Sequence, residues 1–150
     1  MPNDPLRADL CAFLTAHEAE LISFRRDMHA HPELGYHEHR ATRRIALRLA
    51  AAGLRPMILP KGTGLIADIG DSRDCGPLVA LRADLDALPL SDEKQVSYRS
   101  TAPNACHACG HDVHTTIVLG AEPYPPGQPA RGGYGSSSSP PRKWPAARWT

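Results

Sequence analysis

The C-terminal segment of the chain, residues 122–150, sets the limit on what the sequence can fold into. It contains no Ile, Leu, Val or Met, and it holds seven of the fifteen prolines and both tryptophans. A segment without aliphatic side chains cannot bury a hydrophobic core, so we predict that these residues are disordered. The foldable part is then residues 5–121, which is enough for one small core.

Net charge, apolar stretches and cysteine spacing limit the kinds of binding partner and functional site that the chain can have. The net charge is +1 and 22% of the residues are charged, which favours neither a nucleic-acid nor a membrane partner. The N-terminus shows no secretory signal and no stretch is apolar enough to span a bilayer, so we expect a cytoplasmic protein. The cysteines are irregularly spaced, which favours metal or thiol chemistry over a disulfide framework. They are Cys11, Cys75, Cys106 and Cys109, and we interpret the first two as ordinary small residues.

Two helices are predicted in the first third of the chain. The first runs from Pro5 to about Met28, with Asp4 as N-cap and proline at the first helical position. The second runs over residues 37–52, with Gly53 at the position after its C-cap. The expected apolar face is Leu6, Leu10, Phe13, Leu14, Leu21 and Phe24 in the first helix, and Ile45, Leu47, Leu49 and the alanines in the second, with Arg40, Arg43, Arg44 and Arg48 outside.

Three short β-type runs follow, "LRPMIL", "GLIADIG" and "PLVALRAD", separated by turn sequences. The third run is apolar on both faces over residues 78–81, which predicts an interior strand. Two helices followed by three strands indicate an α/β layer fold with a central sheet. Asp84 and Asp86 come at the C-terminal end of the third run, the edge at which α/β sheets usually bind ligands. A loop is predicted over residues 91–105 and a further helix from about His111.

The segment "NACHACGHDVHTT", residues 104–116, is dense in side chains that bind metals. Cys109 and His111 flank a glycine, so a thiolate and an imidazole can turn toward one divalent cation, and this S/N pair suits Zn²⁺. Incidental histidines on a surface loop are the alternative, and the acidic strand end nearby favours the metal. Further ligands, or acceptors that fix an imidazole tautomer, are expected among Asp84, Asp86, Asp112 and His114.

Two other interpretations of the cysteines and histidines remain open at this point. Cys106 and Cys109 form a C-x-x-C pair, which is typical of a thiol-redox site or of half a structural zinc site. No second C-x-x-C or H-x₃-H follows to complete such a zinc site. In "MHAHPELGYHEHR" a structural role is favoured over a ligand role for His29, His31, His37 and His39.

Three segments together resemble a known family. "RRDMHAHPELGYHEHRAT", "LRADLDALPL" and "HACGHDVHTTIVLGA", in this order and spacing, resemble the M20 family of metal-dependent amidohydrolases. The most similar branch contains hippurate hydrolase, auxin-conjugate hydrolases and N-acyl-amino-acid amidohydrolases. The resemblance covers residues 20–121 and implies the N-terminal part of a dinuclear-metal, aminopeptidase-like catalytic domain. Helices packed on a central mixed sheet are then expected within residues 1–121, as an incomplete domain.

The resemblance also implies roles for individual residues. Cys109 and His111 match the family's first two metal ligands, and Asp86 matches the acid that orients a ligand. Cys106 stands where the family more often has an apolar residue, which weakens the redox interpretation. The implied activity is hydrolysis of the amide bond of N-acyl amino acids, small-molecule substrates, with two divalent ions, Zn²⁺ or Mn²⁺. The family's smaller domain, for dimerisation and substrate binding, is absent from these residues, so a homodimer is expected only for the full-length protein.

The general-base glutamate of this family stands in a "FQPAEE"-type motif, and the printed sequence lacks that motif. In a shifted frame, the codons of "ARGGYGSSSSPPRKWPAARWT" are compatible with "PGRVRLIFQPAEEVAGGALD". This reading requires AGC at Ser139, TCN at the three preceding serines, AGG at Arg142 and TAC at Tyr134. We therefore expect a frameshift near Ala121, in the gene or in its sequencing. The chain as written is expected to be inactive, with an open sheet edge that favours aggregation.

Overall fold

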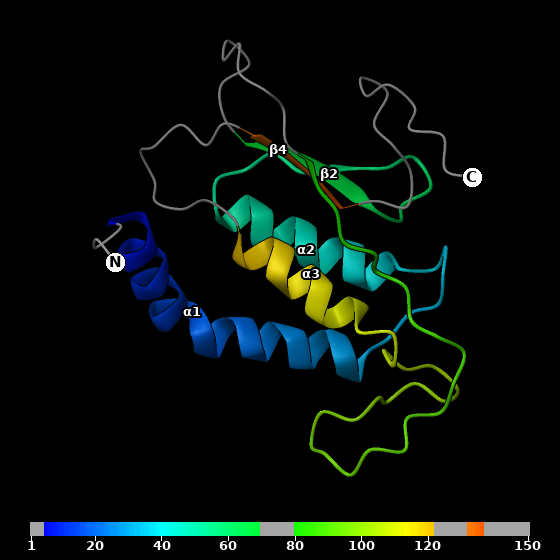
Figure 1. Cartoon of the computed structure of the whole chain (residues 1–150). Helices are drawn as coiled ribbons and strands as arrows, with labels where there is room; N and C mark the ends of the chain where they lie inside the picture. The colour runs from blue at the N-terminus through cyan, green and yellow to red at the C-terminus, as the bar shows by residue number, and fades with distance from the viewer. Residues whose placement is uncertain (1–4, 70–79, 122–131, 137–150) are drawn as a thin grey trace, which may run out of the picture.

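The computed structural model describes residues 5–69, 80–121 and 132–136. The helices of this part of the chain all lie on one side of its sheet, with α2 and α3 beneath the strands (Figure 1). The mixed α/β fold expected from the sequence is confirmed. In chain order the elements are α1 (Pro5–Ala30), α2 (His39–Ala51), β1 (Met57–Ile58), β2 (Leu65–Ile69), β3 (Ala80–Leu81), α3 (His111–Gly120) and β4 (Gly132–Ser136).

The sheet has the strand order β1-β2-β4-β3. Strand β2 pairs antiparallel with β1 and with β4, whereas β3 and β4 are parallel. The predicted interior strand over residues 78–81 can be compared only at Ala80 and Leu81, because residues 78 and 79 lie outside the described residues. In the described residues β3 lies at the edge of the sheet and contains only Ala80, which is exposed, and Leu81, which is half-buried. An apolar run gives a strand its tendency to be buried, but the neighbouring strands decide whether burial occurs.

Strand β4 lies within the segment for which the sequence predicts disorder. Its backbone pairs with β2 from Leu65↔Ser136 to Ile69↔Gly132. Strand pairing uses backbone N–H and C=O groups, so a glycine-rich run can form a ladder without supplying a core side chain. The prediction of disorder therefore does not hold for Gly132–Ser136, and residues 122–131 and 137–150 lie outside the described residues, as does the predicted turn at Cys75.

The core forms between the sheet and helices α2 and α3. In α2 the buried side chains recur every three or four residues, as a helical face requires. Leu47, which was expected inside, is 66% exposed because a residue two positions from Ile45 points to the opposite side of a helix. The central cluster consists of Ile45, Leu49, Leu65, Ala67, Leu85 and Leu119, with Phe24, Ala46 and Leu54 packed against it.

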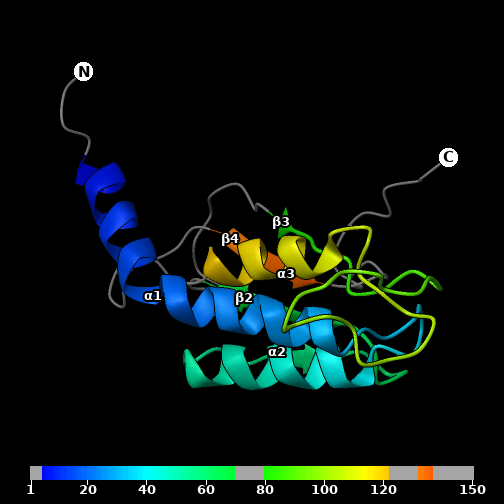
Figure 2. The same cartoon turned by 90° about the horizontal axis from the view of Figure 1, so that it is seen from below.

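Helix α1 packs against the rest of the described structure only through its C-terminal half. Met28 is 1% exposed, whereas Leu10 and Leu14 are 43% and 42% exposed, so the expected apolar face is not buried along its whole length. The N-terminal part of α1 extends beyond α2 and α3 (Figure 2). At the contact with α3, a Cβ on Gly120 would lie 3.3 Å from a methyl group of Leu21, so this glycine allows the two helices to approach closely.

Both ends of α2 are capped. Gly53 adopts φ +83°, and the Leu54 backbone N–H donates to the Leu49 carbonyl at 3.0 Å, so the predicted C-terminal glycine is confirmed. At the other end, the Glu33 carboxylate accepts hydrogen bonds from the backbone N–H groups of Arg40 and Ala41, at 2.9 and 2.8 Å. Nowhere in the described ranges does a helix reach the length and apolarity needed to cross a membrane.

Candidate metal centre

The candidate site forms where the three motif segments meet. After β3, the Ala87 backbone N–H donates to the Glu33 carbonyl at 2.8 Å. Leu88 and Cys106 then exchange two backbone hydrogen bonds of 3.0 Å each. The segment that ends in "DALP" therefore lies between "HPEL" and "NACHACGH", which are far apart in the sequence.

Cys109, His111 and Asp86 converge at this junction. The His111 Nδ1 atom lies 2.9 Å from the Asp86 carbonyl oxygen and 3.0 Å from its Oδ1 atom. The Cys109 Sγ atom lies 3.6 Å from the same carbonyl oxygen. We call Cys109 and His111 the donor pair, because each could donate an electron pair to a metal ion. Gly110, between them, adopts φ +83°, a conformation that glycine tolerates, and α3 begins directly after it.

This arrangement fits a metal-binding imidazole. The two Asp86 oxygens accept hydrogen bonds, so in a neutral His111 imidazole Nδ1 carries the proton and Nε2 has the lone pair. Histidines that bind metals usually donate their other N–H to a carboxylate or a backbone carbonyl in this way. The His111 and Asp86 side chains are 22% and 39% exposed, so the site is open to solvent. The described residues supply this thiol and imidazole pair but contain no cluster of three or more potential ligands.

The other predicted candidates occupy different positions. The Asp84 carboxylate is held by the Arg82 guanidinium, with a shortest distance of 2.7 Å. The imidazole rings of His114 and His111 are 5.9 Å apart. Asp112 points away from the donor pair into the protein, where its side chain is fully buried. Cys106 is a buried free thiol and Cys109 a half-buried one.

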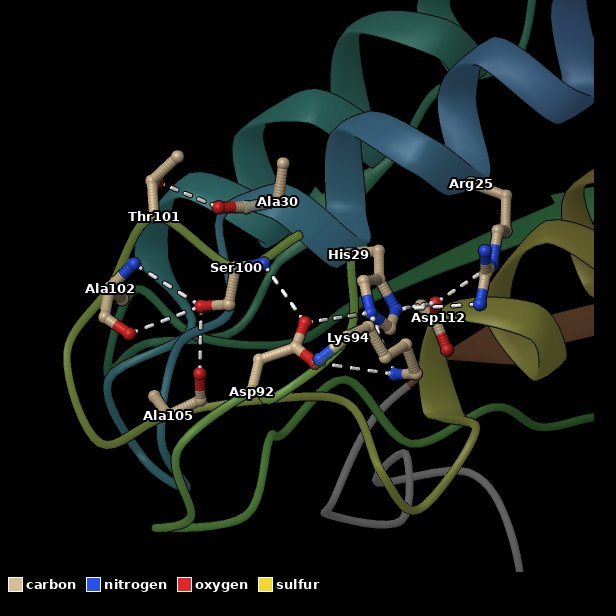
Figure 3. Close-up of polar contacts among 10 residues, drawn as sticks. All are labelled: Arg25, His29, Ala30, Asp92, Lys94, Ser100, Thr101, Ala102, Ala105 and Asp112. Atoms are coloured by element: carbon tan, nitrogen blue, oxygen red, sulfur yellow. Dashed lines mark hydrogen bonds and ion pairs between the residues drawn. The ribbon is translucent and has the colours of Figure 1, made fainter. Parts of the chain in front are cut away.

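A buried polar network joins α1, the loop over residues 91–105 and the start of α3 (Figure 3). The His29 Nδ1 atom, from α1, donates to the Asp112 Oδ2 atom of α3 at 2.7 Å. The Arg25 Nε atom lies 2.9 Å from the same oxygen. On its other side His29 approaches Asp92 at 3.3 Å and Lys94 at 3.1 Å. The two carboxylates are matched by two cations, as buried charges require. The structural role expected for His29 agrees with this position.

Hydrogen bonds of the same network fix the loop over residues 91–105. The Asp92 carboxylate accepts the backbone N–H groups of Ser100 and Lys94 at 3.0 and 3.1 Å. The Thr101 backbone N–H and hydroxyl both donate to the Ala30 carbonyl at the end of α1, at 2.8 and 2.7 Å. The predicted loop is therefore confirmed, and its path into the donor segment is fixed by hydrogen bonds to α1.

Burial controls the protonation of His107, which lies between Cys106 and the donor pair. Desolvation lowers the pKa of His107 to about 4, and this outweighs the opposing effect of the Asp112 carboxylate. Its ring is 4% exposed, and its Nδ1 atom has no hydrogen-bond partner. His107 is therefore a neutral imidazole at neutral pH.

The hydrogen bond from the Ser100 backbone, followed by that from Lys94, lowers the pKa of Asp92 to about 2 from its usual 3.8. A carboxyl group with a depressed folded-state pKa stabilises the fold fully above pH 3.8, and this contribution is lost as the pH falls towards 2. We therefore expect the difference in unfolding free energy between the parent chain and Asp92→Asn to shrink from pH 5 to pH 2. Urea titrations at several pH values measure this difference. The exposed neighbour Glu93→Gln controls for the loss of one charge, and a pH-independent effect of Asp92→Asn would contradict the assignment.

The sequence pattern predicts Cys109 and His111 as a candidate pair of metal ligands, but it does not predict the buried network beside them. Asp92, Lys94 and Arg25 were not singled out, because the contacts that join them to His29 or Asp112 across the network span 63 or more positions of the chain. One signal was present: Arg25 and His29 are four residues apart and so share a helical face, next to the buried Met28.

Comparisons with known proteins show which family the chain resembles. The sequence profile of peptidase family M20/M25/M40 matches residues 80–122. The chain is 40% identical over 106 residues to N-acetylcysteine deacetylase of Bacillus subtilis, covering 70% of this chain and 28% of that protein. It is 37% identical over 103 residues to N-acyl-L-amino acid amidohydrolase of Geobacillus stearothermophilus, covering 69% and 28%.

A further match concerns a longer protein, the putative glutamate–cysteine ligase 2-3 of Rhodococcus jostii. It is 46% identical over 113 residues, which make up 73% of this chain and 14% of that protein. Most of that ligase lies outside the matched residues, so its name says nothing about the activity of the present chain.

The fold is also found in a solved structure, the YXEP protein of Bacillus subtilis, described as a dinuclear metal-binding peptidase from the M20 family. The TM-score is 0.65 at 39% identity, and the match covers 70% of this chain and 29% of that one. The chain thus spans less than a third of the length of these relatives. By sequence and by fold, the chain belongs to the peptidase M20 family.

Proposed function

We propose that the complete protein hydrolyses the amide bond of N-acyl amino acids with the help of divalent metal ions. The named activities of two relatives, N-acetylcysteine deacetylase and N-acyl-L-amino acid amidohydrolase, support this substrate class. The description of the YXEP protein as a dinuclear metal-binding peptidase supports the metal dependence. We further propose Zn²⁺ or Mn²⁺ as the ion, the cytoplasm as the compartment, and a homodimer as the assembly of the full-length protein.

The convergence of Cys109 and His111 on Asp86 is the observation that carries this proposal. In this arrangement His111 Nδ1 would keep its proton on the Asp86 oxygens, and His111 Nε2 would be available to hold the ion. Cys109 supplies a thiolate on the same side, and Asp86 orients the imidazole. When bound, divalent ions supply an activated water and polarise the scissile carbonyl. The general base that the reaction also needs is a glutamate which the printed sequence does not provide.

We propose that the codons of the C-terminal segment encode this glutamate in a shifted frame. Strand β4 supports the proposal because of its position between β2 and β3. In the shifted frame the codons that begin at Gly132–Ser136 are compatible with "RVRLI", a far better strand sequence than "GGYGS", since glycine is depleted in strands. The same reading continues into "FQPAEE". In this proposal the chain as written has only the first part of the fold and lacks turnover.

The metal part of the proposal is tested by cobalt binding to the 150-residue chain. Co²⁺ is a spectroscopic substitute for Zn²⁺, which is itself silent. We expect Cys109→Ser to abolish the thiolate-to-cobalt charge-transfer band, and His111→Ala to weaken Co²⁺ binding by at least about tenfold. Cys106→Ser and His31→Ala are the matched controls and should retain both properties. If Cys106→Ser alone abolished the band, the thiol-redox or structural-zinc module built on Cys106 and Cys109 would replace the amidohydrolase interpretation.

A further inference from the structure

The first turn of α3 is held from two sides. His111 is fixed on the outer side by its hydrogen bonds to Asp86. The next residue, Asp112, is fixed on the inner side by His29 and Arg25 of α1. Consecutive residues at the start of a helix point about 100° apart, so these two sets of contacts together fix the rotation of the turn.

The inner contacts are better shielded from water than the outer ones. The side chains of His29 and Asp112 are 1% and 0% exposed, whereas that of Asp86 is 39% exposed. A buried hydrogen bond to a charged group is short and directional, and no water replaces it when it is lost. The 2.7 Å bond between His29 Nδ1 and Asp112 is therefore the firmest restraint on the direction in which His111 presents its Nε2 atom.

We propose that His29 is a positioning residue for the donor pair, acting through Asp112. The His29 Nδ1–H group holds the Asp112 carboxylate, and thereby holds the adjacent His111 at the angle at which Nε2 and the Cys109 thiolate reach the same ion. The proposal rests on the function proposed above, because the ion concerned is the same. It adds a residue from α1, more than 75 positions away in the sequence, that never touches the metal.

The two ends of the His29 imidazole make a matched test possible. An asparagine amide takes the place of Nδ1, and a glutamine amide takes the place of Nε2. His29→Asn therefore keeps a donor for Asp112 and loses the contact with Asp92 and Lys94. His29→Gln does the reverse. Both variants put a neutral amide at the same buried position, so a general loss of packing affects them alike.

The measurement is titration of the purified 150-residue chain and its variants with Co²⁺ alone, followed by the thiolate-to-cobalt charge-transfer band. We expect His29→Gln to weaken Co²⁺ binding about tenfold or more and to reduce the band, and His29→Asn to stay within about threefold of the parent. Leu49→Ala, a core change on α2 outside the network, is the stability control. It should lower the urea midpoint without weakening Co²⁺ binding.

Two results would overturn the inference. If His29→Asn and His29→Gln bind Co²⁺ equally, or if affinity follows the urea midpoint in all variants including Leu49→Ala, then His29 is only structural. The function proposed above would survive that result, provided that His111→Ala still weakens Co²⁺ binding. If His111→Ala and Cys109→Ser bind Co²⁺ like the parent, the donor pair is not a metal site, and both proposals fail together.

Discussion

Restoring the shifted reading frame after Ala121 should give a metal-dependent amidohydrolase, whereas we expect the 150-residue chain to be inactive. Among the described residues no three side chains are placed so that they could hold one metal ion together, and the proposed ligands are only the Cys109 thiol and the His111 imidazole. A general base alone contributes about 10²–10⁴-fold to such a reaction, and completing the metal site adds further stabilisation of the transition state. We therefore expect a gain of at least about 10⁴-fold over the 150-residue chain.

The assay is hydrolysis of N-acetyl and N-benzoyl amino acids, with and without a chelator. The matched control is the restored protein with glutamine in place of the first glutamate of "FQPAEE". It should bind metal and lose most of the activity, because only the proton-transferring group is removed. Turnover by the 150-residue chain equal to that of the restored protein would contradict the proposed loss of function.

Leu65→Ala should destabilise the described core by about 2–5 kcal/mol, since it leaves a cavity beneath the sheet. Leu65 is 0% exposed and lies in β2, at the centre of the cluster that joins the sheet to α2 and α3. Small domains have an unfolding free energy of about 5–15 kcal/mol, so this single change removes a large share of it.

The matched control for this prediction is Leu47→Ala, because Leu47 belongs to α2 but is 66% exposed. Its effect should stay within about 0.5 kcal/mol. Urea unfolding of both variants at low protein concentration, followed by far-UV circular dichroism, gives the comparison. Equal effects of the two substitutions would mean that the core is not packed around β2 as described.

The sequence predicts the elements of this fold better than their burial. The helix boundaries at Pro5 and His111 agree with the expected ones to within a residue or two, because proline, glycine and apolar spacing act locally. Burial depends on neighbours far away in the chain. Leu10 and Leu14 have the spacing of a core face and are exposed, because α1 extends past its partners.

In the candidate site, too, local features could be predicted from the sequence and contacts between distant residues could not. The proximity of Cys109 and His111 was predictable, because both candidate ligands lie in one short segment and suit the same metal. The support for Asp112 was not predictable, because it comes from Arg25 and His29, which are more than 80 residues earlier. No local pattern in the sequence specifies which buried carboxylate a helical histidine will meet.

The proposed frameshift is tested most directly by the nucleotide sequence of the gene, read from the codon of His111 to several hundred bases past that of Thr150. We predict AGC at Ser139, AGG at Arg142 and TAC at Tyr134, followed by an open shifted frame with further histidine ligands. The chain would then be an M20 amidohydrolase interrupted near Ala121. Codons that forbid "FQPAEE" in the shifted frame would show that the C-terminal segment is native, and would contradict the proposed origin of this chain.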